Sequence, residues 1–185
     1  MVRVLDQIKR CDDGKTRERR LDRVDKVVIH KIGASLGTTG PEIADAFRDT
    51  RKYQAGYYTG GQVGYHLVIR PDGIVDQCLH LTDTGAHAAR FNLKSIGVAI
   101  VAEHEHFSEY PPTGEQWLAL IELCVIFRDM GMTIHGHTEL GKGATSDPKK
   151  DCPGPLVPLD ELRSEVALMR ESKVLEKVRE VGLVL

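Results

Sequence analysis

The sequence has few cysteines, almost no net charge and no long apolar run, and each absence excludes a class of protein. Four cysteines in 185 residues are too few for a disulfide scaffold, and this indicates a reducing compartment. The 25 basic and 27 acidic residues leave a formal charge of −2, so charge gives no reason to expect nucleic acid or an anionic membrane as a partner. A hydrophobic content of 41% is enough for one domain with a real core.

Membrane insertion and export are also unsupported. No apolar run approaches the roughly 20 residues that a membrane span requires. The N-terminus has no apolar segment behind its first charges, as a signal peptide would have. We therefore expect synthesis in the cytoplasm without a signal peptide.

Helices and strands are expected to alternate along the chain. Short β-branched or apolar runs predict strands, whereas capping-box patterns followed by apolar residues at helical spacing predict helices. The expected strands lie at 26–30, 64–69, 73–77, 95–102 and 132–137, and the expected helices begin near Thr39, Thr113 and Pro158. This order predicts an α/β fold with a central mixed β-sheet flanked by helices. In the strand at 64–69, alternation places Tyr65 on the same face as Leu67 and Ile69, opposite His66 and Val68.

Both ends of the chain differ in composition from the middle. Residues 1–25 are charged and have little periodicity, so we interpret them as an N-terminal surface arm, with Arg17 to Arg20 as a solvated basic cluster. Residues 26–172 form the expected domain. Residues 173–185 continue an amphipathic pattern as a C-terminal tail.

Three residues are candidate metal ligands: His30 after the apolar run 27–29, His137, and Cys152 in the segment Asp151-Cys152-Pro153-Gly154. Histidine and cysteine are the side chains that bind zinc best, and three protein ligands would leave the fourth position open for water, as in catalytic sites. They are too far apart in sequence for a zinc finger. Taken singly, each also has an ordinary structural explanation, because buried cysteines and hydrogen-bonded histidines are common.

Other histidines compete for the same role. His135 lies two residues before His137, so in a strand both would point to one face and either could reach a metal. His104 and His106 are spaced like a metal-binding pair, but their acidic segment is more typical of a solvated loop.

Six motifs, in order, resemble the zinc amidases of the bacteriophage lysozyme type, which are related to peptidoglycan recognition proteins and bacterial muramoyl amidases. The resemblance covers about residues 26 to 165. The motifs are Val28-Ile29-His30, Val63-Gly64-Tyr65-His66, Gly85-Ala86-His87-Ala88, Asn92-Leu93-Lys94-Ser95-Ile96-Gly97-Val98, His137-Thr138-Glu139 and Lys150-Asp151-Cys152-Pro153.

The resemblance implies a peptidoglycan recognition protein-like amidase fold and a role for each matching residue. It implies one Zn²⁺ per chain, held by His30, His137 and Cys152. The family's catalytic tyrosine and lysine fall on Tyr65 and Lys150. Positions that line the family's substrate groove fall on His87 and Asn92. The implied reaction is hydrolysis of the amide between N-acetylmuramic acid and L-alanine in bacterial peptidoglycan.

Two departures from the family pattern stand out. Some bacterial relatives have a glutamate general base where this chain has Ala99, which leaves the version of the mechanism with tyrosine and lysine. The segment between His137 and Cys152 is also longer than in the phage enzymes.

The resemblance favours a phage or prophage endolysin that needs a separate membrane-pore protein to reach the cell wall. A cytoplasmic amidase that recycles muropeptides is an alternative with the same chemistry. A second alternative is a recognition module that binds peptidoglycan without cleaving it. Cys152 argues against that module, because such family members usually lack the cysteine ligand.

Overall fold

The computed structural model describes residues 2–11, 17–34, 38–48, 64–102, 111–141, 151–169 and 181–184. Six strands form one sheet in the order β1-β4-β3-β5-β2-β6. Their bounds are β1 Val4–Asp6, β2 Lys26–Gly33, β3 Leu67–Ile69, β4 Val75–Gln77, β5 Ser95–Ala102 and β6 Thr133–Gly136. Four neighbouring pairs are parallel and β3 pairs with β4 antiparallel, so the predicted mixed sheet is confirmed.

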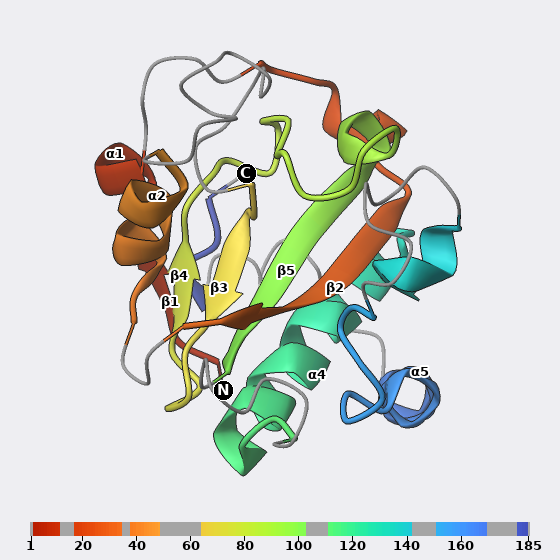
Figure 1. The fold of residues 1–185 in the computed structure, drawn as a ribbon. Helices are drawn as coiled ribbons and strands as arrows, with labels where there is room; N and C mark the ends of the chain where they lie inside the picture. Colours follow the sequence, from red (N-terminus) through yellow and green to blue (C-terminus); the bar gives the residue numbers. More distant parts are fainter. Residues whose placement is uncertain are drawn as a thin grey trace.

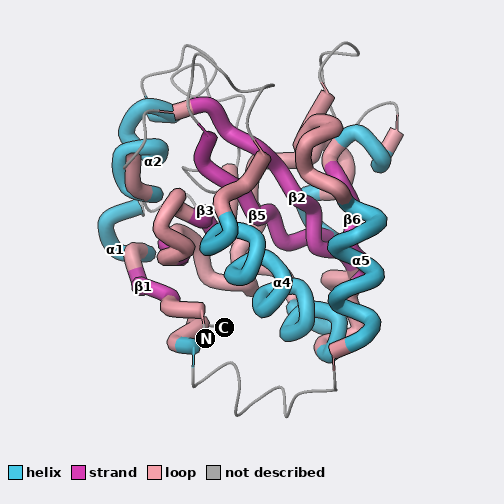
Figure 2. Tube along the Cα trace, turned by 90° about the horizontal axis from the view of Figure 1, so that it is seen from below, coloured by secondary structure: helices cyan, strands magenta, loops and turns pink. Residues whose placement is uncertain are grey.

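Helices cover both faces of this sheet. The helices are α1 Ile8–Cys11, α2 Gly40–Arg48, α4 Gly114–Asp129 and α5 Leu159–Leu168, with short 3₁₀ helices at Leu21–Arg23, Asn92–Lys94 and Thr138–Leu140. Figure 1 shows α4 crossing beneath β5 and β2, with α1 and α2 together beside β4 and β1. Turned by 90°, the tube in Figure 2 shows α5 next to α4 on the same side of the sheet.

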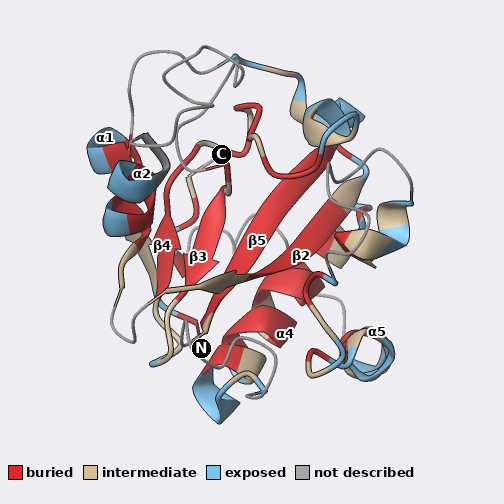
Figure 3. Cartoon of the chain, viewed as in Figure 1, coloured by how far each residue is buried: buried red, intermediate tan, exposed pale blue. Residues whose placement is uncertain are grey.

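The main core lies between the sheet and α4. Alternate residues of β2 and β5 (Val27, Ile29, Ile96, Val98 and Ile100) pack there against the buried side of α4. A smaller apolar cluster on the opposite face joins α1 and α2 to β3 and β5. Figure 3 shows β3, β4, β5 and the middle of β2 as buried, and the outer sides of α1, α2 and α5 as exposed.

Helix α4 begins where its sequence predicts. The hydroxyl of Thr113 accepts a hydrogen bond from the backbone N–H of Gln116, and the Gln116 side chain accepts one from the N–H of Thr113. This reciprocal capping box supplies partners for two N–H groups. The turn between β3 and β4 also forms as predicted, with Gly73 at a positive φ of 77°.

The N-terminal arm differs from the expected surface segment. Val4–Asp6 forms edge strand β1 by pairing with β4, because three residues suffice to extend an existing sheet. The basic cluster is also not wholly solvated: Arg19 is half-buried and donates hydrogen bonds to the carbonyls of Asn92, Ser95 and Leu81. Burial lowers the pKa of Arg19 to about 10.

The end of the tail packs onto the domain. Val181 and Leu183 are buried in the main core. The Gln77 side chain donates to the Val184 carbonyl at 2.6 Å and accepts from its N–H at 2.7 Å. None of the described helices is long and apolar enough to cross a membrane.

Candidate metal centre

His30 lies in the middle of β2, on the face opposite α4. Val27 and Ile29 point into the main core, so strand alternation turns His30 to the other side. The strand continues to Gly33, so the expectation that His30 closes the strand is wrong. His30 is 1% exposed. The His30 backbone pairs with Ala99 of β5, and the preceding residue, Ile29, pairs with Gly136 of β6.

His137 reaches His30 through the pairing of β6 with β2. Gly136, the last residue of β6, is the register partner of Ile29, and the N–H of His137 donates to the Ile29 carbonyl at 3.2 Å. The chain then turns into a 3₁₀ helix, with His137 at φ −56°. The centroids of the His30 and His137 rings are 4.6 Å apart.

Cys152 is brought in by a loop that packs tightly on β6. A Cβ at Gly136 would lie 2.5 Å from Leu159 Cδ1 and 3.0 Å from Pro153 Cδ, so a side chain here would push the loop away. The N–H of Thr138 donates to the Cys152 carbonyl at 3.0 Å. The Cys152 Sγ lies 3.7 Å from His30 Nδ1. Parallel pairing and a close loop contact thus join residues that are 122 positions apart.

The three candidate ligands form one compact group. One ligand atom from each of His30, His137 and Cys152 lies within 4.8 Å of the others. All three side chains are buried: His137 is 7% and Cys152 3% exposed. Neighbouring corners of a tetrahedral zinc site with nitrogen and sulfur ligands are about 3.6 Å apart, given the usual bond lengths. The 3.7 Å between Sγ and Nδ1 matches that separation.

Of the three competing histidines, the structure describes only His135. His135 is outside this group, and its Nε2 lies 2.9 Å from the hydroxyl of Thr133. Strand alternation does not put it beside His137, because β6 ends between them at Gly136. Burial lowers the pKa of His135. The pair His104 and His106 lies outside the described residues.

Tyr65 lies beside the metal ligands rather than in the main core. Its ring centroid is 5.0 Å from that of His30, and it packs on the small apolar cluster with Val68. The predicted shared face with Leu67 and Ile69 is wrong. Because β3 starts only at Leu67 and Gly64 has a positive φ of 75°, strand alternation does not extend back to Tyr65.

His87 and Asn92 come from the irregular segment between β4 and β5. Asn92 Oδ1 accepts hydrogen bonds from the N–H groups of His87 and Ala88, at 3.1 and 2.7 Å. The His87 ring is buried, with Nδ1 3.0 Å from His30 Nε2. Burial and the nearby charge of Arg19 lower the pKa of His87 to about 3. The ring is therefore neutral at pH 7.

His66 has partners that the sequence did not indicate. Its Nδ1 accepts a hydrogen bond from the N–H of Gly97 at 3.0 Å, and its Nε2 lies 3.0 Å from the carbonyl of Asp83. Its ring contacts that of His87, with centroids 5.6 Å apart. Burial, then the charge of Arg19, lowers the pKa of His66 well below its usual value.

Comparison with protein families gives a match over residues 20–155 to the N-acetylmuramoyl-L-alanine amidase family Amidase_2. The matched range includes all three members of the buried group. The chain belongs to this family. The predicted membership and the predicted enzyme class, an N-acetylmuramoyl-L-alanine amidase, are therefore confirmed. A search of curated protein sequences gives no match.

Solved structures share the fold of this amidase over most of its length. The endolysin amidase LysCS of Clostridium intestinale is 19% identical with a TM-score of 0.68, covering 91% of this chain and 97% of that one. The Ph2119 endolysin of a Thermus scotoductus bacteriophage is 22% identical with a TM-score of 0.66, covering 89% and 99%. Drosophila PGRP-LB is 17% identical with a TM-score of 0.62, covering 95% and 98%. The predicted peptidoglycan recognition protein-like amidase fold is thus confirmed.

Other predicted features of the amidase are only partly described. Ala99 is buried as the register partner of His30 in β5, so this position offers no carboxylate. Lys150 lies outside the described residues, as do residues 142–149 of the longer segment between His137 and Cys152.

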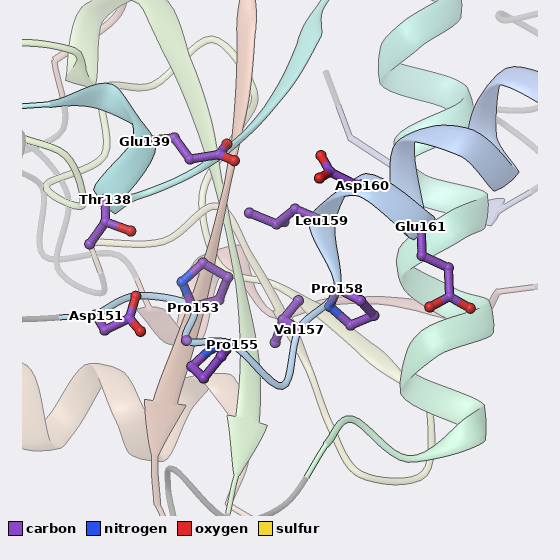
Figure 4. Close-up of a pocket in the computed structure, with 11 residues that line it drawn as sticks. Thr138, Glu139, Asp151, Pro153, Pro155, Val157, Pro158, Leu159, Asp160 and Glu161 are labelled. Atoms are coloured by element: carbon purple, nitrogen blue, oxygen red, sulfur yellow. The ribbon is translucent and has the colours of Figure 1, made fainter.

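A pocket of about 380 Å³ is lined by the loop around Cys152, by the start of the 3₁₀ helix Thr138–Leu140 and by the start of α5. Figure 4 shows its lining, which includes Thr138, Asp151 and Pro153 from the neighbourhood of the metal ligands. Arg163 of α5 forms ion pairs with two further lining residues, Glu139 and Asp160. The pair with Glu139 joins the 3₁₀ helix Thr138–Leu140 to α5, whereas Asp160 lies within α5 itself.

Proposed function

We propose that this amidase hydrolyses the amide between the lactyl group of N-acetylmuramic acid and L-alanine in bacterial peptidoglycan, using one Zn²⁺ held by His30, His137 and Cys152. The observation that carries the proposal is the convergence of these three buried side chains from β2, the end of β6 and the loop before α5. Two imidazoles and a thiolate are an established zinc donor set.

The number of ligands favours a catalytic over a structural metal. Structural zinc sites have four protein ligands, whereas catalytic sites have three and keep one position open. When bound in such a site, zinc acts as a Lewis acid that lowers the pKa of a coordinated water to about 7 and can polarise a carbonyl. The buried group excludes bulk solvent from one side of the site, which strengthens electrostatic interactions within it.

Two further side chains are proposed to act on the substrate amide. Tyr65, whose ring lies against that of His30, would orient the water or the carbonyl through its hydroxyl. Lys150, two residues before Cys152 in the sequence, would stabilise the developing oxyanion. Ala99 supports this division of roles, since no carboxylate stands at its position to act as a general base. His87 and Asn92 are proposed to border the groove that binds the sugar and peptide.

The biological setting is proposed to be a phage or prophage endolysin, released to the cell wall by a separate membrane-pore protein. Two of the structural relatives carry the name endolysin. Substrate size separates this role from muropeptide recycling in the cytoplasm. An endolysin should solubilise intact sacculi, whereas a recycling enzyme should cleave soluble muropeptides and leave sacculi intact.

The test of the reaction is release of new L-alanine amino groups from purified murein by the zinc-loaded protein. Dialysis against a chelator should abolish the release, and added Zn²⁺ should restore it. Cys152→Ser should lose activity by at least about 10²-fold, since it replaces a thiolate ligand with a hydroxyl. Cys124→Ser, on the buried side of α4, is the matched control and should stay active.

A recognition module would give a different result. Fully zinc-loaded protein that binds murein but releases no amino groups would contradict the amidase reaction for this chain.

A further inference from the structure

The two ring nitrogens of His30 face different neighbours. Nδ1 lies 3.7 Å from Cys152 Sγ, on the side of the proposed metal, while Nε2 lies 3.0 Å from His87 Nδ1. A neutral imidazole has one N–H donor and one acceptor nitrogen. If Nδ1 of His30 presents its lone pair to the metal, Nε2 must carry the hydrogen. His87 Nδ1 then has to accept that hydrogen.

The surroundings of His87 place its own hydrogen on the opposite nitrogen. The hydroxyl of Ser95 donates to the carbonyl of Phe91 at 2.9 Å, so its lone pairs remain for a donor. His87 Nε2 lies 3.4 Å from this oxygen. The Nε2–H of His87 can therefore point at Ser95, which leaves Nδ1 as the acceptor. The three hydrogen bonds then all donate in one direction: His30 donates to His87, His87 donates to Ser95, and Ser95 donates to the carbonyl of Phe91.

Missing side chains on two glycines make room for the His87 ring. A Cβ at Gly97 would lie 2.6 Å from His87 Cγ and 2.9 Å from its Nδ1. A Cβ at Gly85 would lie 3.0 Å from His87 Cδ2. Asn92 also fixes the His87 backbone through its hydrogen bonds to residues 87 and 88. The ring thus has little freedom to turn away from His30.

We propose that His87 is a positioning residue that holds His30 as the Nε2–H tautomer, with Nδ1 turned to the metal. This inference rests on the proposed function, because it assumes that His30 is a zinc ligand. Metal-binding histidines generally donate their other N–H to a fixed acceptor, and loss of that acceptor weakens metal binding. Here the acceptor is a second histidine from the segment between β4 and β5.

Zinc affinity, measured by competition with a fluorescent chelator in the absence of substrate, tests this role. His87→Leu removes the acceptor while filling much of the space, and should weaken zinc binding about 10- to 100-fold. His87→Asn keeps a side-chain oxygen near the position of Nδ1, and should bind zinc within about threefold of the parental protein. A purely structural role would not make the asparagine variant differ from the leucine variant in this way.

His80→Leu is the matched control, because His80 lies in the same segment outside the metal-binding group. It should leave zinc affinity unchanged. Unchanged affinity in His87→Leu, or equal weakening in the leucine and asparagine variants, would overturn the inference. If the parental protein binds no zinc, the proposed function itself fails, so the two failures are distinguishable.

The tautomer can also be measured without any substitution. In the ¹⁵N-labelled, zinc-loaded protein, nitrogen–proton correlation NMR should show the His30 hydrogen on Nε2 and the His87 hydrogen on Nε2. A His30 hydrogen on Nδ1 would overturn the inference even if the leucine variant failed to fold.

Discussion

The hydroxyl of Thr138 donates a hydrogen bond to the carbonyl oxygen of Cys152, 3.1 Å away. It adds to the bond from the Thr138 N–H to the same oxygen. Thr138 directly follows His137, so one residue ties the third candidate ligand to the second. The bond is a local clamp between segments that are 14 positions apart.

Thr138→Val should loosen this clamp while keeping the shape of the side chain. A neutral hydrogen bond contributes about 1 kcal/mol, so zinc affinity should fall by roughly two- to fivefold. Chelator competition measures the change. Thr133→Val is the matched control, because its hydroxyl also donates to a carbonyl, that of Asp25, at the far end of β6. An equal loss of zinc affinity in both variants would contradict a local role of Thr138.

Gly97→Ala should disturb the protein through the ring of His87. The added Cβ would lie 2.6 Å from His87 Cγ, so the ring or strand β5 must move. Overpacking of this kind costs about 1 to 3 kcal/mol of unfolding free energy. Urea unfolding measures this cost, and zinc affinity should fall with it. Gly114→Ala, where a Cβ meets nothing within 4 Å, should leave the unfolding free energy and the zinc affinity unchanged. If Gly97→Ala is as stable as the parental protein, the close packing of His87 on Gly97 is contradicted.

Stability should decrease in mild acid because of His66. Its folded pKa lies well below the unfolded value of about 6.5, mainly through burial. Above pH 6.5 both states are neutral; below it the unfolded state binds a proton that the folded state does not. The unfolding free energy should therefore fall by up to about 1.4 kcal/mol per pH unit from this group.

His66→Asn keeps an acceptor for the Gly97 N–H but does not titrate. Its unfolding free energy, measured in urea at several pH values without zinc, should fall less steeply below pH 6.5. Parallel pH profiles for the two proteins would refute the assignment.

Asp76→Ala should destabilise the fold strongly. The Asp76 carboxylate is fully buried, pairs with Arg70, and accepts from the N–H of Gly40 at 2.7 Å where α2 begins. Removing it leaves the N–H of Gly40 and the partly exposed Arg70 guanidinium without the carboxylate, a loss of about 1 to 3 kcal/mol. Thermal or urea unfolding measures it. Asp22→Ala, which removes the exposed partner of Arg20, should change stability little, and similar losses in both would contradict the burial argument.

Local patterns predicted much of the fold. The apolar run at 95–102 matches β5 residue for residue, and the capping box places the start of α4 correctly. In both, a single periodicity or cap determines the element. The proximity of His30, His137 and Cys152 was predicted from the resemblance, because the order of the motifs matches a family whose members share one three-dimensional arrangement. The spacing of the three residues in the sequence does not predict their proximity.

The remaining features depend on partners distant in sequence. Strand β1 is too short for its own periodicity to mark it, and it exists through pairing with β4. Arg19 looks like a solvated cation in sequence, yet carbonyls of a distant segment bind it. Tyr65 does not share the predicted face with Leu67 and Ile69, because β3 starts two residues after it. The contact of His87 with His30 requires Gly85 and Gly97, and the sequence alone does not distinguish these from ordinary turn and strand residues.

Cobalt substitution is the most direct test of the central claim that Cys152 and two histidines bind one metal ion. Co²⁺ bound by a thiolate gives a near-ultraviolet charge-transfer band, which titration should bring to saturation at one equivalent per chain. We predict that Cys152→Ser abolishes the band while Cys124→Ser keeps it. A band that persists in Cys152→Ser, or a parental protein that binds no cobalt, would contradict the account.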